Sequence, residues 1–258
     1  MNKGLLYFAD DPHCPGLGRD NGDKYIKEAA ISIGSMRRFH KDCPPVTIFT
    51  NHKKCDIKNV NLVEIDHDDY KKVTNQDVSY ARGSKPNRIM SLMQSPYEYA
   101  IYMDNDTFAL SPVLDDIYQL LKRSDIAMCH SGVVPKGYGR EIPATFPEFN
   151  CGLIAFRKSK CMGLFEKWLE LYSKTMGGHD QGTFRTAIWQ SDLNIATMPQ
   201  QYNWRYKGSL PLVASERPNT KKALVKLDWW KRIPMPKIIH NRKTQQLYAA
   251  GKLEKYVK

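Results

Sequence analysis

Two carboxylates, Asp104 and Asp106, directly follow the apolar run of residues 99–103. A short, uninterrupted apolar run is typical of a strand in the middle of a parallel sheet that is covered on both faces. Such sheets bind ligands beyond the carboxyl ends of their strands, so the two carboxylates are expected where a ligand would lie. Mg²⁺ and Mn²⁺ prefer oxygen ligands, commonly carboxylates together with the phosphate oxygens of a substrate. The Asp-X-Asp sequence therefore predicts a site for a divalent cation and a phosphate-bearing ligand; the alternative is an acidic turn after a strand.

Three further segments carry polar residues suited to the same chemistry. They are Phe-Asn-Cys-Gly at residues 149–152, His-Asp-Gln-Gly at residues 179–182, and the pair Ile239 and His240. In their order and approximate intervals, these segments and the acidic pair resemble the nucleotide-sugar glycosyltransferases with a GT-A fold, nearest to family 8 and its glycogenin-like members. The opening of the chain also resembles that family, so the resemblance extends over nearly the whole sequence.

One segment departs from the family pattern. The family's tail, His-X-X-Gly-X-X-Lys-Pro-Trp, corresponds here to His240-Asn-Arg-Lys-Thr-Gln, which has neither the glycine nor the Pro-Trp pair. The resemblance nevertheless implies that Asp104, Asp106 and His240 hold a divalent cation, Mn²⁺ or Mg²⁺, between the two phosphates of the donor. The imidazole ligand favours Mn²⁺, which tolerates nitrogen better than Mg²⁺ does.

The resemblance also implies which residues act on the sugar and which contact the donor. Asp180 and Gln181 would lie near the anomeric carbon, and Asn150 would hydrogen-bond the donor sugar; these three are the candidate catalytic residues. The candidate donor-binding residues are Tyr7, Ala9, Arg82, Lys85, Asp104, Asn105 and Gly152. Tyr7 and Ala9 would contact the nucleobase, and Gly152 would let the backbone approach the sugar closely.

The function implied by the resemblance is transfer of a sugar from a nucleotide diphosphate, UDP-linked, to the hydroxyl of a glycan or another acceptor, with retention of anomeric configuration. Two alternatives remain. A sugar-1-phosphate nucleotidyltransferase would carry a Gly-rich loop with a basic end after its first strand, and the opening here lacks one. A non-catalytic carbohydrate-binding protein would not need Asp104, Asp106 and Asp180, which are all present.

Composition indicates the number of domains and the charge of the expected partners. The 258 residues contain no long Pro/Gly/Ser linker, so one domain is expected. The resemblance implies a donor-binding part at about 1–110 and an acceptor- and sugar-binding part at about 111–258. Lys and Arg number 39 against 27 Asp and Glu, and the net charge of +12 favours an acidic partner such as a nucleotide diphosphate. Nucleic acid is disfavoured because the basic residues are spread out and no zinc-finger, RRM or basic-zipper signature is present.

Hydropathy and cysteine spacing indicate the compartment. The first residues form too short an apolar run for a signal peptide, and no run of ~18 apolar residues could form a transmembrane segment. The six cysteines include no Cys-X-X-Cys pair, which argues against a zinc site. We therefore expect mostly free thiols and a cytoplasmic protein.

Apolar periodicity predicts an α/β sheet. The resemblance implies that this is the GT-A fold, with a single Rossmann-like mixed sheet flanked by helices. Strands are expected at residues 5–9, 46–50, 62–65, 99–103, 126–129, 153–156 and 238–240, and helices at about 26–38, 84–95, 113–121, 165–172 and from Asp180 onward. Ser84 is the expected N-cap of its helix, with Lys85 and Pro86 in the first turn. Residues 10–22 and 131–148 are expected to be loops, and the second is a candidate lid or acceptor loop.

Overall fold

The structure is a computed structural model that describes residues 2–10, 24–52, 55–65, 80–131, 141–175, 180–205 and 236–251, without the side chains of residues 80–84. Most of the two expected loops lies outside the described residues. Gly177 and Gly178, between the expected helices at 165–172 and from Asp180 onward, also lie outside the described residues.

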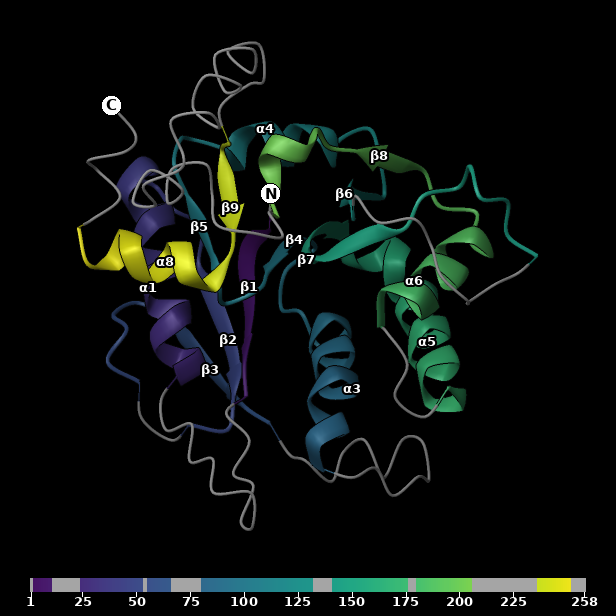
Figure 1. The fold of residues 1–258 in the computed structure, drawn as a ribbon, viewed down its shortest axis with the longest axis horizontal. Coiled ribbons are helices and arrows are strands. Elements are labelled where there is room, and N and C mark those ends of the chain that lie inside the picture. Colours follow the sequence, from purple (N-terminus) through teal and green to yellow (C-terminus); the bar gives the residue numbers. More distant parts are fainter. Residues whose placement is uncertain are drawn as a thin grey trace, which may run out of the picture.

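The main sheet has seven strands in the order β3-β2-β1-β4-β7-β6-β8 (Figure 1). In chain order they are β1 (Lys3–Ala9), β2 (Val46–Thr50), β3 (Asn61–Glu64), β4 (Tyr99–Met103), β6 (Ile126–His130), β7 (Phe149–Arg157) and β8 (Ile195–Thr197). Strand β7 runs antiparallel to β4 and β6, and the other neighbours are parallel. The expected α/β fold with a mixed central sheet is confirmed.

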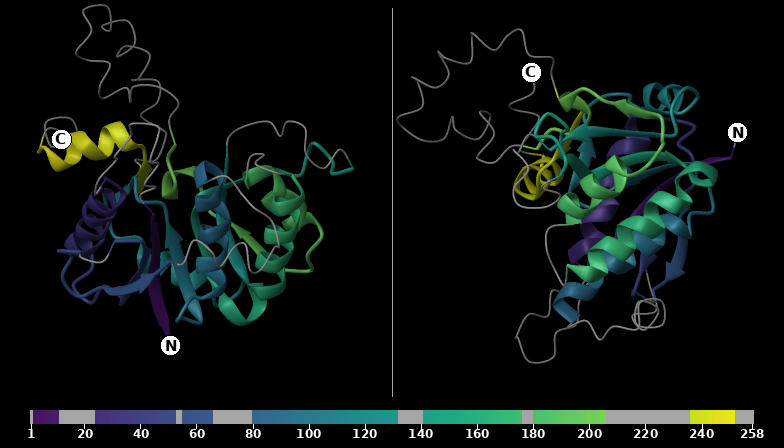
Figure 2. Two further views of the ribbon diagram at one scale, coloured as in Figure 1. Left: turned by 90° about the horizontal axis from the view of Figure 1, so that it is seen from below. Right: turned by 90° about the vertical axis from the view of Figure 1, so that its right-hand side faces the viewer.

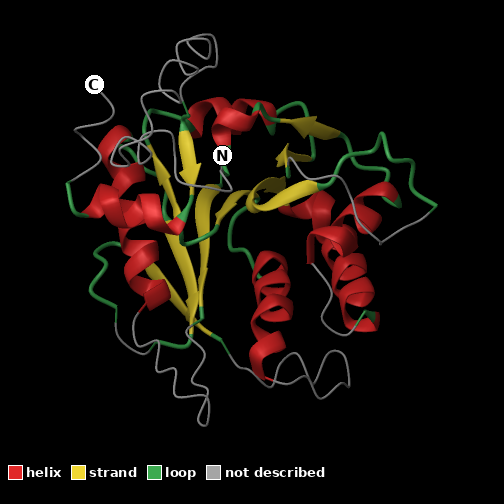
Figure 3. Ribbon diagram, in the orientation of Figure 1, coloured by secondary structure: helices red, strands yellow, loops and turns green. Residues whose placement is uncertain are grey.

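Helices cover both faces of this sheet (Figure 3). They are α1 (Lys24–Phe39), α3 (Tyr80–Met93), α4 (Leu114–Leu120), α5 (Lys158–Lys174), α6 (Asp180–Trp189) and α8 (Arg242–Ala249), with the short 3₁₀ helix η1 (Gln200–Tyr202). One core cluster joins α1 and α4 to the sheet, and a second joins α3, α5 and α6 to its other face. Helix α8 lies against α1, as the left view of Figure 2 shows.

Side chains of β1 alternate between these two cores, as the period of two in a strand requires. Leu5, Tyr7 and Ala9 belong to the core beneath α1 and α4. Leu6 and Phe8 belong to the core beneath α3, α5 and α6. This alternation decides which residues at the end of β1 can face a ligand.

A second, two-stranded sheet lies beside the main one. It pairs β5 (Thr107–Ala109) with β9 (Ile238–His240) in antiparallel register, so that Thr107 lies opposite His240. Its apolar side chains, Phe108 and Ile239, are covered by α8, where the ring of Tyr248 stacks on Phe108 with centroids 4.8 Å apart. A turn of three residues separates β4 from β5, and that turn carries the acidic pair.

Four elements were not expected from the sequence: β5, β8, η1 and α8. Helix α5 begins at Lys158, seven residues before its expected start. Two further differences bear on the site. Helix α3 begins at Tyr80, so Ser84 is not an N-cap and Pro86 lies inside the helix. A proline inside a helix costs one backbone hydrogen bond, which the rest of α3 evidently tolerates. Strand β7 begins at Phe149, four residues before the expected start, because β6 pairs with it there, with His130 opposite Phe149. Asn150 and Gly152 therefore lie within a strand and not in a turn.

Candidate active site

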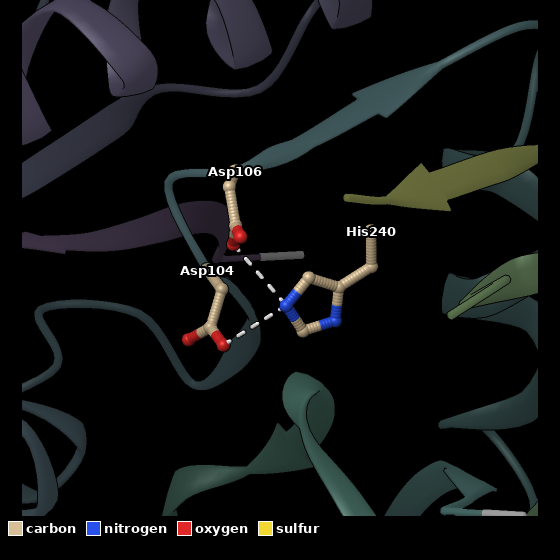
Figure 4. A group of neighbouring side chains, drawn as sticks. All are labelled: Asp104, Asp106 and His240. Carbon is tan, nitrogen blue, oxygen red and sulfur yellow. Dashed lines mark ion pairs between the residues drawn. The ribbon is translucent and has the colours of Figure 1, made fainter. Parts of the chain in front are cut away.

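Asp104, Asp106 and His240 converge at the end of β4 (Figure 4). The Nε2 atom of His240 lies 3.4 Å from Oδ2 of Asp104 and 3.2 Å from Oδ1 of Asp106. One ligand atom from each of the three residues can be chosen so that all lie within 4.8 Å of one another. Two carboxylates and an imidazole form a donor set that suits Mn²⁺. The residues present therefore fit the divalent cation expected from the sequence.

Backbone pairing brings the histidine to the acidic pair. Because β9 runs antiparallel to β5, its last residue lies opposite the first residue of β5, directly after Asp106. The backbone N–H of Asn241 then donates to the carbonyl of Asp106 at 3.1 Å. These contacts need no particular side chain, so β9 reaches the site without the glycine or the Pro-Trp pair of the family tail.

The turn between β4 and β5 is held from three directions. Asn105, which was expected to contact the donor, donates from Nδ2 to the carbonyl of Phe8 at 2.7 Å and so ties the turn to β1. Thr107 Oγ1 donates to the carbonyl of Asp104 at 2.8 Å. From α8, the buried Gln245 donates to the carbonyls of Asn105 and Thr107 at 2.7 and 2.9 Å. The two acidic side chains therefore project from a fixed backbone.

Gly152 lies against the imidazole of His240, where no side chain would fit. A Cβ atom on this residue would lie 2.1 Å from Cε1 of His240 and 2.9 Å from Oδ2 of Asp104. Its carbonyl also accepts a hydrogen bond from the N–H of Asp104 at 2.8 Å. A residue with a Cβ atom would therefore collide with the Asp104–Asp106–His240 cluster, a reason for glycine here that the sequence did not reveal.

Charge and burial act against each other in the cluster. Burial disfavours the charged forms of both Asp104 and His240, but their mutual attraction outweighs it. The pKa of Asp104 is held well below its usual range by His240 and Arg88, with a further hydrogen bond from the Tyr102 hydroxyl at 2.7 Å. Despite burial, the carboxylates of Asp104 and Asp106 raise the pKa of His240 to about 9. Without a cation, the imidazole is therefore protonated at neutral pH.

A cation must displace that proton, because only neutral imidazole coordinates. At about pH 7.5, binding of Mn²⁺ should therefore release close to one proton, measured by isothermal titration in buffers of different ionisation enthalpy. His240→Gln should release markedly less. Equal proton release in both proteins would contradict the role of His240 as a metal ligand.

The pKa of His240 also governs the stability of the metal-free protein. It is raised from 6.5 to about 9 on folding, so the stabilisation by His240 is complete below about pH 6.5 and is lost as the pH rises through 9.

Arg88 links the cluster to Asp180. From α3, its guanidinium contacts Asp180 through Nη2 and lies 3.5 Å from Oδ1 of Asp104 through Nη1. The guanidinium also lies 5.7 and 5.6 Å from the ring centres of Tyr102 and Trp168. Burial would lower the pKa of Arg88, but Asp180 and its other neighbours raise it well above the usual value, so the charge is permanent.

Sequence analysis missed Arg88, although one signal was available. Arg88 lies three residues after Lys85, and residues three apart in a helix share a face. The structure places Lys85, an expected donor-binding residue, at the same cavity, where its Nζ atom lies 3.6 Å from Oδ1 of Asp180. The two basic side chains therefore approach the same carboxylate from α3.

The three candidate catalytic residues differ in their surroundings. Asp180, at the start of α6, faces the cavity described below. Gln181 donates to a carboxylate oxygen of Glu148 at 2.8 Å. Asn150 is buried, and its Oδ1 accepts from the N–H of Gly152 at 2.8 Å. Gln181 and Asn150 are not among the described residues that line the cavity.

Tyr7 and Ala9, the expected nucleobase contacts, are not among the described residues that line the cavity. Both side chains are fully buried, and the Tyr7 hydroxyl bonds to Ser32 Oγ at 3.0 Å on the α1 side of the sheet. Because neighbouring residues of a strand face opposite sides, Phe8 is the residue of β1 that lines the cavity. The side chain of Arg82 lies outside the described residues.

A cavity of about 360 Å³ opens over the metal cluster. It is lined by Phe8, Asp10, Tyr25, Glu28, Lys85, Arg88, Tyr102, Asp104, Asn105, Asp106, Asp180, Arg205, His240 and Arg242. Most of these side chains are charged, with four basic and five acidic residues among them. Once a divalent cation offset the acidic cluster, the basic residues would make the cavity attractive to an anion.

Comparisons with known proteins identify the fold. No family model matches the chain, and no curated protein matches it in sequence. Among solved structures, an active-site mutant of LgtC aligns with a TM-score of 0.60 at 10% identity, covering 92% of this chain and 86% of its own. Galactosyltransferase LgtC in complex with donor and acceptor sugar analogs aligns at 0.58 and 12%, with the same coverage. Mouse xyloside xylosyltransferase 1, in its apo form, aligns at 0.59 and 10%, covering 95% and 99%. The chain therefore has the fold of these GT-A glycosyltransferases.

Proposed function

We propose that this protein is a metal-dependent glycosyltransferase, which moves a sugar from a nucleotide diphosphate, UDP-linked, to the hydroxyl of a glycan or another acceptor. The observation that carries the proposal is the convergence of Asp104, Asp106 and His240 in a charged cavity of a GT-A fold. The proposal extends the fold likeness to function, because these are the residues that the sequence resemblance assigns to the cation.

A divalent cation bound by this cluster, Mn²⁺ or Mg²⁺, would neutralise negative charge on the departing diphosphate. The protein itself adds positive charge from Arg242 and Arg205, which line the same cavity. Arg242 is held in place on α8 by an ion pair with Glu28 of α1 and lies over the ring of Tyr25 at 5.5 Å. A guanidinium fixed in this way can bind phosphate oxygens without first being ordered.

Asp180 and Arg88 would position the sugar. Asp180 is held at the cavity wall by Arg88 and Lys85, so its carboxylate is oriented before a ligand arrives. Hydrogen bonds from such fixed groups to sugar hydroxyls would bring the anomeric carbon to the acceptor in a reactive geometry. Phe8 would face the base-proximal part of the donor in place of Tyr7. Retention of anomeric configuration remains part of the proposal on the strength of the sequence resemblance.

The compartment is also a proposal. The five cysteines among the described residues are free thiols, in keeping with the expected cytoplasm. Within the described part of the chain, no helix has the length and apolar character needed to cross a bilayer.

Thermal stabilisation by a panel of nucleotide-sugars, with and without Mn²⁺, tests the proposal. Selective binding raises the unfolding temperature by mass action, so we expect a shift with UDP-linked sugars only when Mn²⁺ is present. Slow release of UDP from the stabilising donor would then separate a transferase from a carbohydrate-binding protein without turnover. Release of a sugar-1-phosphate from that donor would instead indicate a nucleotidyltransferase. Absence of any metal-dependent shift across the panel would refute the proposal.

A further inference from the structure

Asn203 lies directly behind the metal cluster, with a side chain that is almost fully buried. Its Oδ1 atom is 3.0 Å from Nδ1 of His240, the ring nitrogen that Figure 4 shows turned away from the two carboxylates. The other ring nitrogen, Nε2, faces Asp104 and Asp106. Asn203 is therefore the described side chain that contacts His240 on the side opposite the cation site.

The backbone fixes Asn203 relative to His240. The next residue, Trp204, donates its N–H to the carbonyl of Ile238 at 2.9 Å and accepts from the N–H of His240 at 3.1 Å. On the other side, the Tyr202 hydroxyl donates to Asp116 at 2.6 Å. The two residues that flank Asn203 are thus hydrogen-bonded to β9 and to α4. These bonds fix the position of the Asn203 amide relative to the imidazole of His240.

The orientation of the amide has a chemical consequence. An oxygen facing Nδ1 keeps a proton on that atom and leaves the lone pair of Nε2 for a cation. The flipped amide would present an N–H group to Nδ1, and the neutral ring would then carry its proton on Nε2, where it would block coordination. One hydrogen bond thus selects the nitrogen that can bind metal.

The unpaired donor of the Asn203 amide supports a role for its oxygen at His240. The Nδ2 atom of Asn203 is buried and has no hydrogen-bond partner among the described residues. A buried amide with an unpaired donor is unfavourable compared with an apolar side chain of the same size. Asparagine at this position is therefore best explained by the need for its oxygen.

We propose that Asn203 is a positioning residue that sets the tautomer of His240, so that Nε2 is the nitrogen that coordinates the divalent cation. This inference rests on the metal dependence in the proposed function. Asn203 does not line the cavity and contacts His240 only on the side away from Asp104 and Asp106. Its effect should therefore be on metal affinity and on the identity of the bound nitrogen.

The first readout is Mn²⁺ affinity, measured by isothermal titration without nucleotide. Asn203→Leu should weaken binding by about 10- to 100-fold, the usual cost of losing the hydrogen-bond partner of a metal-bound histidine. Asn203→Asp keeps an oxygen in the same place and should recover most of the affinity. Asn194→Ala is the matched control, because its Nδ2 donates to the carbonyl of Arg123 at 2.6 Å at the β8 edge, and its affinity should be unchanged.

The second readout identifies the bound nitrogen. In ¹⁵N-histidine spectra with Cd²⁺ as a diamagnetic probe, wild-type His240, assigned with His240→Gln, should be metal-bound at Nε2 and protonated at Nδ1. Asn203→Leu should lose this single pattern; if that variant does not fold, Asn203→Ala takes its place. Unchanged affinity and an unchanged pattern would overturn the inference. Failure of the wild type to bind Mn²⁺ would instead refute the metal site in the proposed function, which separates the two failures.

Discussion

Asp106→Asn should abolish Mn²⁺-dependent binding of UDP while leaving the fold intact. The Asp106 carboxylate is partly exposed at the cavity and lies 3.2 Å from Nε2 of His240, so its place is in the cluster and not in a core. Loss of an outer partner of a metal ligand already costs 10- to 100-fold, and loss of a ligand itself should cost more than about 100-fold. Isothermal titration of UDP, with and without Mn²⁺, measures the effect.

The matched control for this variant is Asp192→Asn, which changes an exposed aspartate that does not line the cavity. It should bind UDP and Mn²⁺ as the wild type does. Asp106→Asn should also keep the wild-type circular dichroism spectrum. An unchanged Mn²⁺-dependent affinity for UDP in Asp106→Asn would mean that the acidic pair is only a turn.

Arg88→Met should destabilise the protein by about 3–5 kcal/mol, the usual cost of removing one partner of a buried ion pair. The side chain of Arg88 is only 12% exposed. Its loss leaves the carboxylates of Asp180 and Asp104 without the guanidinium that pairs with both. The remaining Lys85 is more exposed and reaches Asp180 alone. Urea unfolding of the metal-free protein measures the change in the free energy of unfolding.

Two variants separate this coupling from general damage. Arg157→Met removes an arginine whose side chain is 29% exposed and whose Nη1 lies 3.7 Å from Asp125, and it should cost far less. In the double variant Arg88→Met with Asp180→Asn, the loss should be smaller than the sum of the single losses, because the second change removes one uncompensated charge. Turnover of Arg88→Met should fall by about 100-fold or more if the proposed positioning of Asp180 is correct. Strictly additive losses would show that the two residues do not act together.

Local pattern was sufficient for the elements whose signal lies in adjacent residues. The apolar run before Asp104 predicted β4, because a strand buried on both faces is apolar throughout. The helical spacing of Phe165 and Trp168 predicted α5, because a helix buried along one face has apolar residues at that spacing. Where a boundary depends on partners, prediction was wrong. Strand β7 starts at Phe149 because β6 pairs with it there.

Site residues, like secondary-structure elements, were predicted where their signal lies in neighbouring residues and were missed where it does not. Asp104, Asp106 and Asp180 lie at the ends of locally recognisable elements, and the structure brings all three to one cavity. The choice between Tyr7 and Phe8 required knowing which face of β1 lies beneath α1, which alternation alone does not tell. Asn203 carries no local signal, because its partner His240 lies in another segment of the chain.

The pairing of β5 with β9 sets the earliest time during synthesis at which His240 can reach Asp104 and Asp106. Thr107 leaves the ribosome long before its partner His240, and at ~5–20 residues per second the interval is on the order of ten seconds. During that interval the nascent chain already contains the acidic pair and Arg88, but neither the imidazole nor Asn203 is in place. A partly synthesised chain that lacks residue 240 therefore cannot bring Asp104, Asp106 and His240 together.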